Sequence, residues 1–365
     1  MKIALLNLPF DNNYGGNLQR LALMQILQDM GYDVTHLFVC FKWYDTRIPG
    51  CLPLYTLIKR IGRKILKDRY VGIYPERHNK NRFLKDNKAV LPFYEKYIKH
   101  TQMINSYEEL CKYKNFDTYI VGSDQVWRKK MTVCYPFSSL FFDFLRNENV
   151  KRIAYGVSFG TNENELSDEE VKTLGELYAK FDAVSVREDS GLDLLKSYGW
   201  TCPNAQLVLD PTFLLSKERY VQIINAGNTR PSDGNMFCYV LDDNDEIEQT
   251  ISETADNKGL HPFRMSINTE GMFSIEQWLR SFMDSYFIVT DSFHGFVFSI
   301  IFNKPVKLIE NKFRGNERFE SIKRMLNYNP ENSDIDWGSI NSKIREWTEI
   351  SMSFLSKSLE TSNEY

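Results

Sequence analysis

Short runs of hydrophobic residues recur along the chain, and most are followed by small or polar residues. The runs are rich in β-branched and aromatic side chains, which are typical of β-strands that are buried in a sheet. They lie at residues 2–8, 118–121, 152–155, 183–186, 207–209, 236–241, 262–266, 286–289 and 306–309. The pattern therefore predicts a series of short strands.

Between these runs, apolar residues return at the three- and four-residue spacing of amphipathic helices. The predicted helices cover 18–30, 81–100, 106–111, 168–180, 190–198, 246–255, 274–282, 296–302 and 319–326. Ser167 is a predicted N-cap, and Ser274 with Gln277 has the spacing of a capping box. The tail at 334–360 predicts one or two amphipathic helices.

Strands that alternate with helices are typical of an α/β protein with parallel sheets. We expect an N-terminal Rossmann-like domain at 1–205, a second Rossmann-like domain at 206–330, and C-terminal helices at 331–365 that pack back on the first domain. Two such halves imply a cleft between them, which is a common position for a small ligand.

The segment Tyr286–Pro305 combines a strand, a polar turn and an apolar helix. His294 falls at the strand-to-helix turn, where open α/β sheets bind ligands. A histidine at this point can move protons near neutral pH. The alternative is a histidine that only caps the helix.

A glycine pair, Gly15 and Gly16, follows the first strand within the polar segment Pro9–Asn17. Glycines before a helix let backbone N–H groups approach an anion closely. The segment lacks the GxGxxG spacing of a dinucleotide site, so a plain tight turn remains open as the other interpretation.

Composition is that of an ordinary globular protein: 365 residues, 42% hydrophobic, 25% charged, with a net charge of −3. The six cysteines contain no CxxC pair, and no cluster has metal-ligand spacing, so we expect reduced thiols, no metal and no cofactor. We expect no nucleic-acid partner. No signal peptide and no long apolar run are found, which predicts a cytoplasmic protein.

Residues 42–83 are strongly basic, with eleven Lys or Arg against three acidic residues. Leu54, Ile58, Ile61 and Ile65 recur at helical spacing within this insertion. A basic amphipathic helix can bind an anionic membrane surface, which would place the protein at the inner face of the membrane. A solvated basic face without a partner is the alternative.

Several motifs occur in an order that resembles the polysaccharide pyruvyl transferase family. They are SDQVW at 123–127, SFG at 158–160, SVRE at 185–188, LDPT at 209–212, TDSFHG at 290–295 and RGNER at 314–318. The resemblance covers roughly residues 1–330. It implies two Rossmann-like domains facing a cleft, as in glycosyltransferases of the GT-B type. It also implies transfer of a pyruvyl group from phosphoenolpyruvate to a hexose of a cell-surface polysaccharide or of its lipid-linked precursor, which gives a ketal.

The chemistry that the resemblance implies requires cations for the phosphate and carboxylate of phosphoenolpyruvate, and arginine suits both groups. We expect His294 to act as acid and base, with Arg187 holding the donor. The expected substrate-binding residues are Gly16, Asn17, Ser123, Asp124, Gln125, Ser158, Ser292, Phe293, Arg314, Asn316 and Arg318. Among these, Asp124 and Asn17 would orient sugar hydroxyls.

Plainer interpretations of two of these residues remain: Arg187 could pair with Glu188 at the surface, and Asp124 could cap the next helix. Ser292 stands where many family members have an arginine. Another cation must then supply that contact, or the donor differs. Two further functions stay open, namely a glycosyltransferase that uses a nucleotide sugar and a non-catalytic binding protein of a polysaccharide assembly complex.

Overall fold

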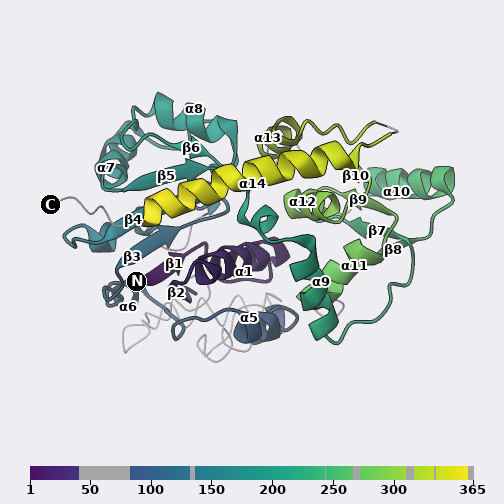
Figure 1. The fold of residues 1–365 in the computed structure, drawn as a ribbon, viewed down its shortest axis with the longest axis horizontal. Helices are drawn as coiled ribbons and strands as arrows, with labels where there is room; N and C mark the ends of the chain where they lie inside the picture. The colour runs from purple at the N-terminus through teal and green to yellow at the C-terminus, as the bar shows by residue number, and fades with distance from the viewer. Residues whose placement is uncertain are drawn as a thin grey trace, which may run out of the picture.

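A computed structural model describes residues 1–40, 83–131, 136–242, 244–265, 272–309, 316–332 and 334–360. Within these residues the chain forms two parallel sheets, each flanked by helices, and a long C-terminal helix that lies along both (Figure 1). The predicted α/β class with two Rossmann-like domains is therefore confirmed. The predicted basic insertion lies outside the described residues, apart from residue 83.

The first sheet has six parallel strands in the order β2-β1-β3-β4-β5-β6. Its strands are β1 (Lys2–Leu6), β2 (Asp33–His36), β3 (Thr118–Val121), β4 (Lys151–Val157), β5 (Ala183–Val186) and β6 (Gln206–Leu207). The order reverses between β1 and β3, where the crevice at the carboxyl ends of a doubly wound sheet opens. Sheet pairing thus extends the first sheet just beyond the boundary that we expected at 205.

Helices cover both faces of this sheet, because alternate residues of β1, β3 and β4 enter two different apolar clusters. The helices are α1 (Tyr14–Asp29), α5 (Leu91–Tyr97), α6 (Tyr107–Leu110), α7 (Asp168–Tyr178) and α8 (Asp189–Ser197). Short 3₁₀ helices lie at Lys129–Met131, Phe137–Phe141, Asp143–Leu145 and Pro211–Leu214.

The second sheet has four parallel strands in the order β10-β9-β7-β8. These strands are β7 (Met236–Tyr239), β8 (Pro262–Arg264), β9 (Phe287–Thr290) and β10 (Val306–Leu308). The helices of this half are α9 (Lys217–Ala226), α10 (Asp245–Lys258), α11 (Ile275–Asp284), α12 (Phe293–Ile301) and α13 (Glu317–Leu326).

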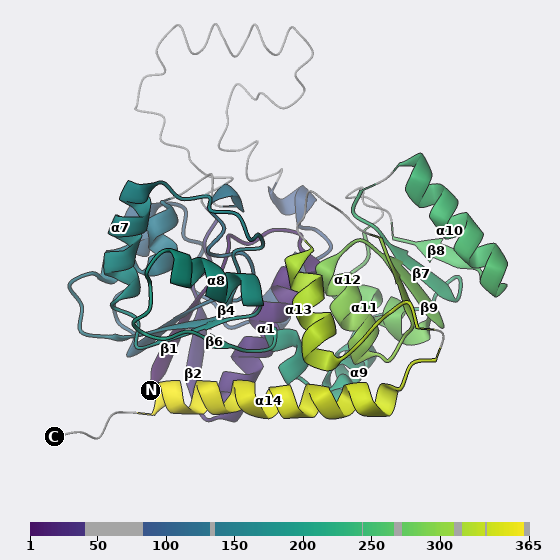
Figure 2. The same ribbon diagram turned by 90° about the horizontal axis from the view of Figure 1, so that it is seen from above.

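The C-terminal helix α14 (Trp337–Leu359) runs from the second half back along the first, as both views show (Figures 1 and 2). Its Trp347 indole donates to the carbonyl of Met325 at the end of α13. Farther along, the Ser351 hydroxyl accepts a hydrogen bond from the backbone N–H of Leu209, just after β6. Helix α14 therefore contacts both halves of the chain.

One apolar cluster passes without a break from the first sheet to the second. At the boundary, the Tyr14 ring of α1 stacks on Trp278 of α11 with centroids 5.4 Å apart, and the Tyr14 hydroxyl donates to the carbonyl of Phe273. In the view of Figure 2, α1, α12 and α13 lie at the centre, between the two sheets. The first turns of α1 and α12 thus meet at the boundary between the halves.

Several local predictions differ from the structure, and α12 begins at Phe293, three residues earlier than predicted. Helix α1 begins at Tyr14, four residues earlier than predicted, because the Asn13 side chain caps it by accepting from the N–H of Gly16. The predicted helix at 81–100 is divided, with α5 starting only at Leu91. Ser274 caps α11, but the Gln277 amide bonds the backbone of Arg230 instead of completing a capping box.

Candidate active site

His294 lies in the first turn of α12, directly after the carboxyl end of β9. The Ser292 hydroxyl caps this helix by accepting from the N–H of Gly295. The capping function that the sequence left open for His294 is therefore performed by Ser292. His294 is buried, with 7% of its surface exposed.

The first turn of α1 lies against the imidazole of His294 from the other half of the molecule. An ideal Cβ built on Gly15 would be 2.0 Å from His294 Nδ1 and 2.1 Å from its Cγ. No side chain larger than hydrogen fits there, which explains a glycine at this position. By contrast, an added Cβ on Gly16 would have no neighbour closer than 3.5 Å.

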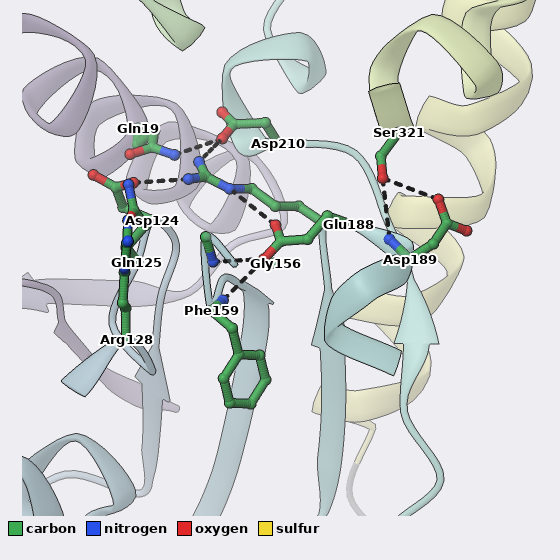
Figure 3. Close-up of polar contacts among 12 residues, drawn as sticks. Gln19, Asp124, Gln125, Arg128, Gly156, Phe159, Glu188, Asp189, Asp210 and Ser321 are labelled. Atoms are coloured by element: carbon green, nitrogen blue, oxygen red, sulfur yellow. Dashed lines mark hydrogen bonds and ion pairs between the residues drawn. The ribbon is translucent and has the colours of Figure 1, made fainter. Parts of the chain in front are cut away.

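Arg187 is the centre of a buried group of three carboxylates (Figure 3). Its guanidinium donates to Asp210 over 2.5 Å and to Asp124 over 2.7 Å, and its Nε lies 3.7 Å from Glu188 Oε2. The Arg187 side chain has no exposed surface. These carboxylates outweigh the effect of burial and raise the pKa of Arg187.

Asp210 connects this group to His294. Its Oδ2 accepts from Arg187 and from the Gln19 side chain of α1, and it lies 3.9 Å from His294 Nε2. Its Oδ1 accepts from the N–H and the hydroxyl of Thr212. Asp210 is fully buried. Its hydrogen bonds with Gln19, Arg187 and Thr212 fix the position of its carboxylate.

Two arginines lie beside the same aromatic ring. The guanidinium carbons of Arg187 and Arg318 are 4.7 Å and 5.1 Å from the Phe293 ring centroid, within the range of cation–π contacts. Arg318, in the first turn of α13, is 7% exposed. Burial, together with the nearby charge of Arg187, lowers the pKa of Arg318 to about 10.

Burial also lowers the pKa of His294 to about 4. Asp210 and Asp124 oppose this shift, while Arg187 and Arg318 add to it. For Asp124, burial acts to raise the pKa, but Arg187, His294 and Arg318 together lower it to about 2. At neutral pH the site therefore contains a neutral imidazole of His294 beside the ionised carboxylate of Asp124.

The lowered pKa of His294 predicts a pH-dependent stability. Its ordinary value is 6.5 and its folded value about 4. Between these values the unfolded chain binds more protons, so the stability should fall as the pH drops from 6.5 towards 4, by up to about 3 kcal/mol. Urea midpoints measured across this range should show the loss.

The control is the His294→Gln variant, which should lose less stability over the same interval. The comparison is needed because burial also lowers the pKa of His36. The lowered pKa of Asp124 affects the stability only at lower pH, below the ordinary carboxyl pKa of 3.8. Parallel curves for the wild type and the variant would contradict the low pKa of His294.

The structure brings several predicted residues together and gives Arg187 a different setting from the expected one. Its three nitrogens already face carboxylates, two of them in hydrogen bonds, so a donor bound here would share this guanidinium with Asp124 and Asp210. Its pairing with Glu188 is also not at the surface, since both side chains are fully buried.

Two of the predicted substrate-binding residues, Asn17 and Gln125, use their side chains in hydrogen bonds within the protein. Asn17 is buried, and its side chain bonds the carbonyls of Asp11 and Asn13 and the guanidinium of Arg20, which leaves it no evident contact with a sugar. The Gln125 carbonyl oxygen accepts from Arg128.

Other predicted positions lie around the same strand ends. Ser123 and Ser158 are buried after β3 and β4, and their hydroxyls have no hydrogen-bond partner within the described residues. Asp124 adopts a left-handed backbone, with φ at 72°, and does not cap a helix. Asn316 precedes α13, whereas Arg314 lies outside the described residues.

Sequence reasoning missed two residues of this cluster, Gln19 and Asp210, and it named Glu188 only as a possible surface partner of Arg187. The Glu188 carboxylate accepts from the N–H groups of Phe159 and Gly160, which fixes the loop after β4 (Figure 3). Asp210 stood in the LDPT motif at the end of a predicted strand, and that position was the available signal. Gln19 gave none, because a polar residue inside a helix is ordinary.

Among the described residues, no group of three or more His, Cys, Asp or Glu side chains has the geometry to hold a metal ion. In the same part of the chain, no helix combines the length and the apolar character that crossing a membrane requires.

A family model named polysaccharide pyruvyl transferase matches residues 13–312, which is most of the chain. The chain belongs to the polysaccharide pyruvyl transferase family. The matched region contains the clustered residues from Asn13 to His294, and Arg318 lies just beyond its end. The resemblance seen in the motifs is confirmed, and the family indicates an enzyme that modifies polysaccharides. A search of curated proteins found no match.

Solved structures resemble this chain only distantly. A UDP-GlcNAc 2-epimerase from Neisseria meningitidis bound to UDP-GlcNAc has a TM-score of 0.46 at 9% identity, covering 99% of this chain and 95% of that one. A UDP-N-acetylglucosamine 2-epimerase from Rickettsia bellii has 0.44 at 8%, covering 98% and 97%. A UGT transferase from Siraitia grosvenorii in complex with UDP has 0.39 at 10%, covering 99% and 96%. At these TM-scores and identities, the similarities assign no role to any residue of this chain.

Proposed function

We propose that this pyruvyl transferase family member takes its pyruvyl group from phosphoenolpyruvate and forms a ketal on a hexose. The observation that supports this most is the arrangement of His294 and two buried guanidinium groups around Phe293, at the boundary between the two sheets. The donor carries a phosphate and a carboxylate, which require fixed cations, and the reaction requires a group that moves protons.

Arg318 is the residue that we assign to the donor's anionic groups. Its lowered pKa means that burial and Arg187 destabilise its charge. The guanidinium stays charged near neutral pH, and a bound anion would offset this destabilisation. The planar fork of arginine suits both phosphate and carboxylate. Arg187, whose nitrogens face carboxylates, instead holds the acidic side chains in place. Arg318 would then supply the contact for which Ser292 provides no cation.

His294 is assigned to proton transfer. The methylene carbon of phosphoenolpyruvate takes up a proton, and the adjacent carbon, now oxocarbenium-like, is attacked by a sugar hydroxyl that loses its proton. The bond to the phosphate oxygen then breaks, phosphate leaves, and a second hydroxyl closes the ketal with loss of its own proton. An anion bound beside Arg318 would raise the pKa of His294, so that the imidazole could both give and accept protons.

Other parts of the proposal rest on the family and the sequence. The acceptor is a hexose of a polysaccharide or of its lipid-linked precursor. Asp124, with 13% of its side chain exposed at the end of β3, is the carboxylate that could orient a sugar hydroxyl. Contact of the basic segment at 42–83 with an anionic membrane surface stays a prediction.

Thermal shift tests the assignment of Arg318. Phosphoenolpyruvate at about 100 times its dissociation constant should stabilise the wild type by about 2.7 kcal/mol, and nucleotide sugars should not. In Arg318→Gln, binding should weaken about 10- to 100-fold because a charged hydrogen bond is lost.

The matched control is Arg324→Gln on the same helix. Arg324 is largely exposed and pairs with Asp189, so this variant should bind phosphoenolpyruvate as the wild type does. An Arg318→Gln variant with unchanged binding would remove Arg318 from the donor site. Stabilisation by a nucleotide sugar alone would favour a glycosyltransferase instead.

A further inference from the structure

The two ring nitrogens of His294 lie in opposite electrostatic surroundings. Nε2 is buried and makes no hydrogen bond within the described residues, and a carboxylate oxygen of Asp210 lies 3.9 Å from it. A nitrogen lone pair at this position would face a negative charge. An N–H would face an acceptor, so the carboxylate favours a proton on Nε2.

One face of the ring, over Cγ and Nδ1, lies against the beginning of α1. Gly15, in the first turn of this helix, is so close that an added Cβ would be 2.0 Å from Nδ1. The first turn of a helix carries partial positive charge, which favours a lone pair over an N–H or a cation nearby. Helix α1 therefore disfavours a proton on Nδ1.

The other charged groups around the ring do not reverse this preference. Asp124 acts on His294 in the same direction as Asp210, whereas Arg187 and Arg318 disfavour the doubly protonated ring. Arg187 is held by its carboxylates. Its guanidinium donates to the same oxygen of Asp210 that lies 3.9 Å from His294 Nε2. Both arginines therefore favour a neutral ring.

We propose that Asp210 is a positioning residue that keeps the proton of neutral His294 on Nε2, and that Nδ1 is the nitrogen that exchanges protons with the substrate. The second half of this statement rests on the proposed function, and the first half does not. In the reaction, with the donor bound, the imidazolium gives its Nδ1 proton to the methylene carbon, and Nδ1 then accepts the proton of the attacking hydroxyl. The Nε2 proton stays in place, stabilised by Asp210. The 3.9 Å gap would shorten as the ring becomes charged, as is common for sites that tighten in the complex.

Nitrogen-15 NMR of the protein with labelled histidine tests this directly. The His294 signals are identified by their absence in His294→Gln. At neutral pH the wild type should show a protonated Nε2 and an unprotonated Nδ1, in a ratio of at least about 10:1, a preference of about 1.4 kcal/mol. In Asp210→Asn, which removes the charge but nearly keeps the shape, this ratio should fall by about tenfold or more.

Thr212→Val is the matched control, because Thr212 contacts only the other oxygen of Asp210. It should keep the wild-type ratio. A proton on Nδ1 in the wild type, or an unchanged ratio in Asp210→Asn, would overturn the proposal, and the wild-type spectrum alone decides if that variant does not fold. Because no substrate is needed, this failure is distinct from a failure of the proposed function, which phosphate release measures separately.

Discussion

Replacing His294 by glutamine should reduce phosphate release from phosphoenolpyruvate about 10²- to 10⁴-fold, the usual contribution of a general acid or base. Glutamine nearly keeps the size and polarity of the side chain but cannot exchange protons near neutral pH. Binding of phosphoenolpyruvate should change little, because the donor's charges are assigned to Arg318. Initial rates of phosphate release at saturating donor measure the effect.

His261→Gln provides the control for this substitution. His261 is exposed and directly precedes β8, away from the carboxyl ends of the strands. This variant should release phosphate at the wild-type rate. If His294→Gln also retained the wild-type rate at every pH tested, the imidazole would have no part in the chemistry, and another residue would have to move the protons.

Replacing Arg187 by methionine should destabilise the folded protein by about 3–5 kcal/mol. The substitution nearly keeps the length of the side chain but leaves Asp124, Glu188 and Asp210 buried together without their shared cation. Removing one partner of a buried ion pair typically costs this much because the remaining charge is uncompensated. Urea denaturation at neutral pH measures the change in the free energy of unfolding.

A surface arginine gives the comparison. Arg219 pairs with Asp29 over 2.6 Å, but its side chain is 39% exposed, so Arg219→Met should cost at most about 1 kcal/mol. Adding Asp210→Asn to Arg187→Met should recover part of the lost stability, because one of the uncompensated charges is then removed. Equal losses for the two arginine variants, without any recovery, would contradict the account of Arg187.

The sequence predicted much of the fold because its strands are short, apolar and followed by polar residues. The strands at Thr118–Val121 and Ala183–Val186 were predicted with their observed bounds, and Ser167 caps α7 as predicted. These features depend on residues close together in the chain. The start of α1 was missed because Asn and Gly in NNYGGN suggest a loop, whereas the Asn13 side chain makes the segment a helix start.

The candidate site was harder to predict because its main contacts join distant parts of the chain. That Arg187 follows a strand could be seen in the sequence, but that three carboxylates surround it could not, since this depends on which strands are neighbours in the sheet. The contact between Gly15 and His294 depends on how the two halves pack, which local periodicity does not encode. The expectations for Arg187 and Asn17 therefore did not include the side chains that contact them in the structure.

The central claim is that this site transfers a pyruvyl group from phosphoenolpyruvate to a sugar. The most direct measurement incubates the protein with phosphoenolpyruvate labelled with carbon-13 at its central carbon and a panel of hexosides, and follows phosphate and the labelled carbon together. We predict phosphate release that depends on a hexoside, with the label moving to a ketal carbon, and loss of both in His294→Gln. Absence of phosphate release with every hexoside, together with turnover of a nucleotide sugar by the same preparation, would contradict the claim.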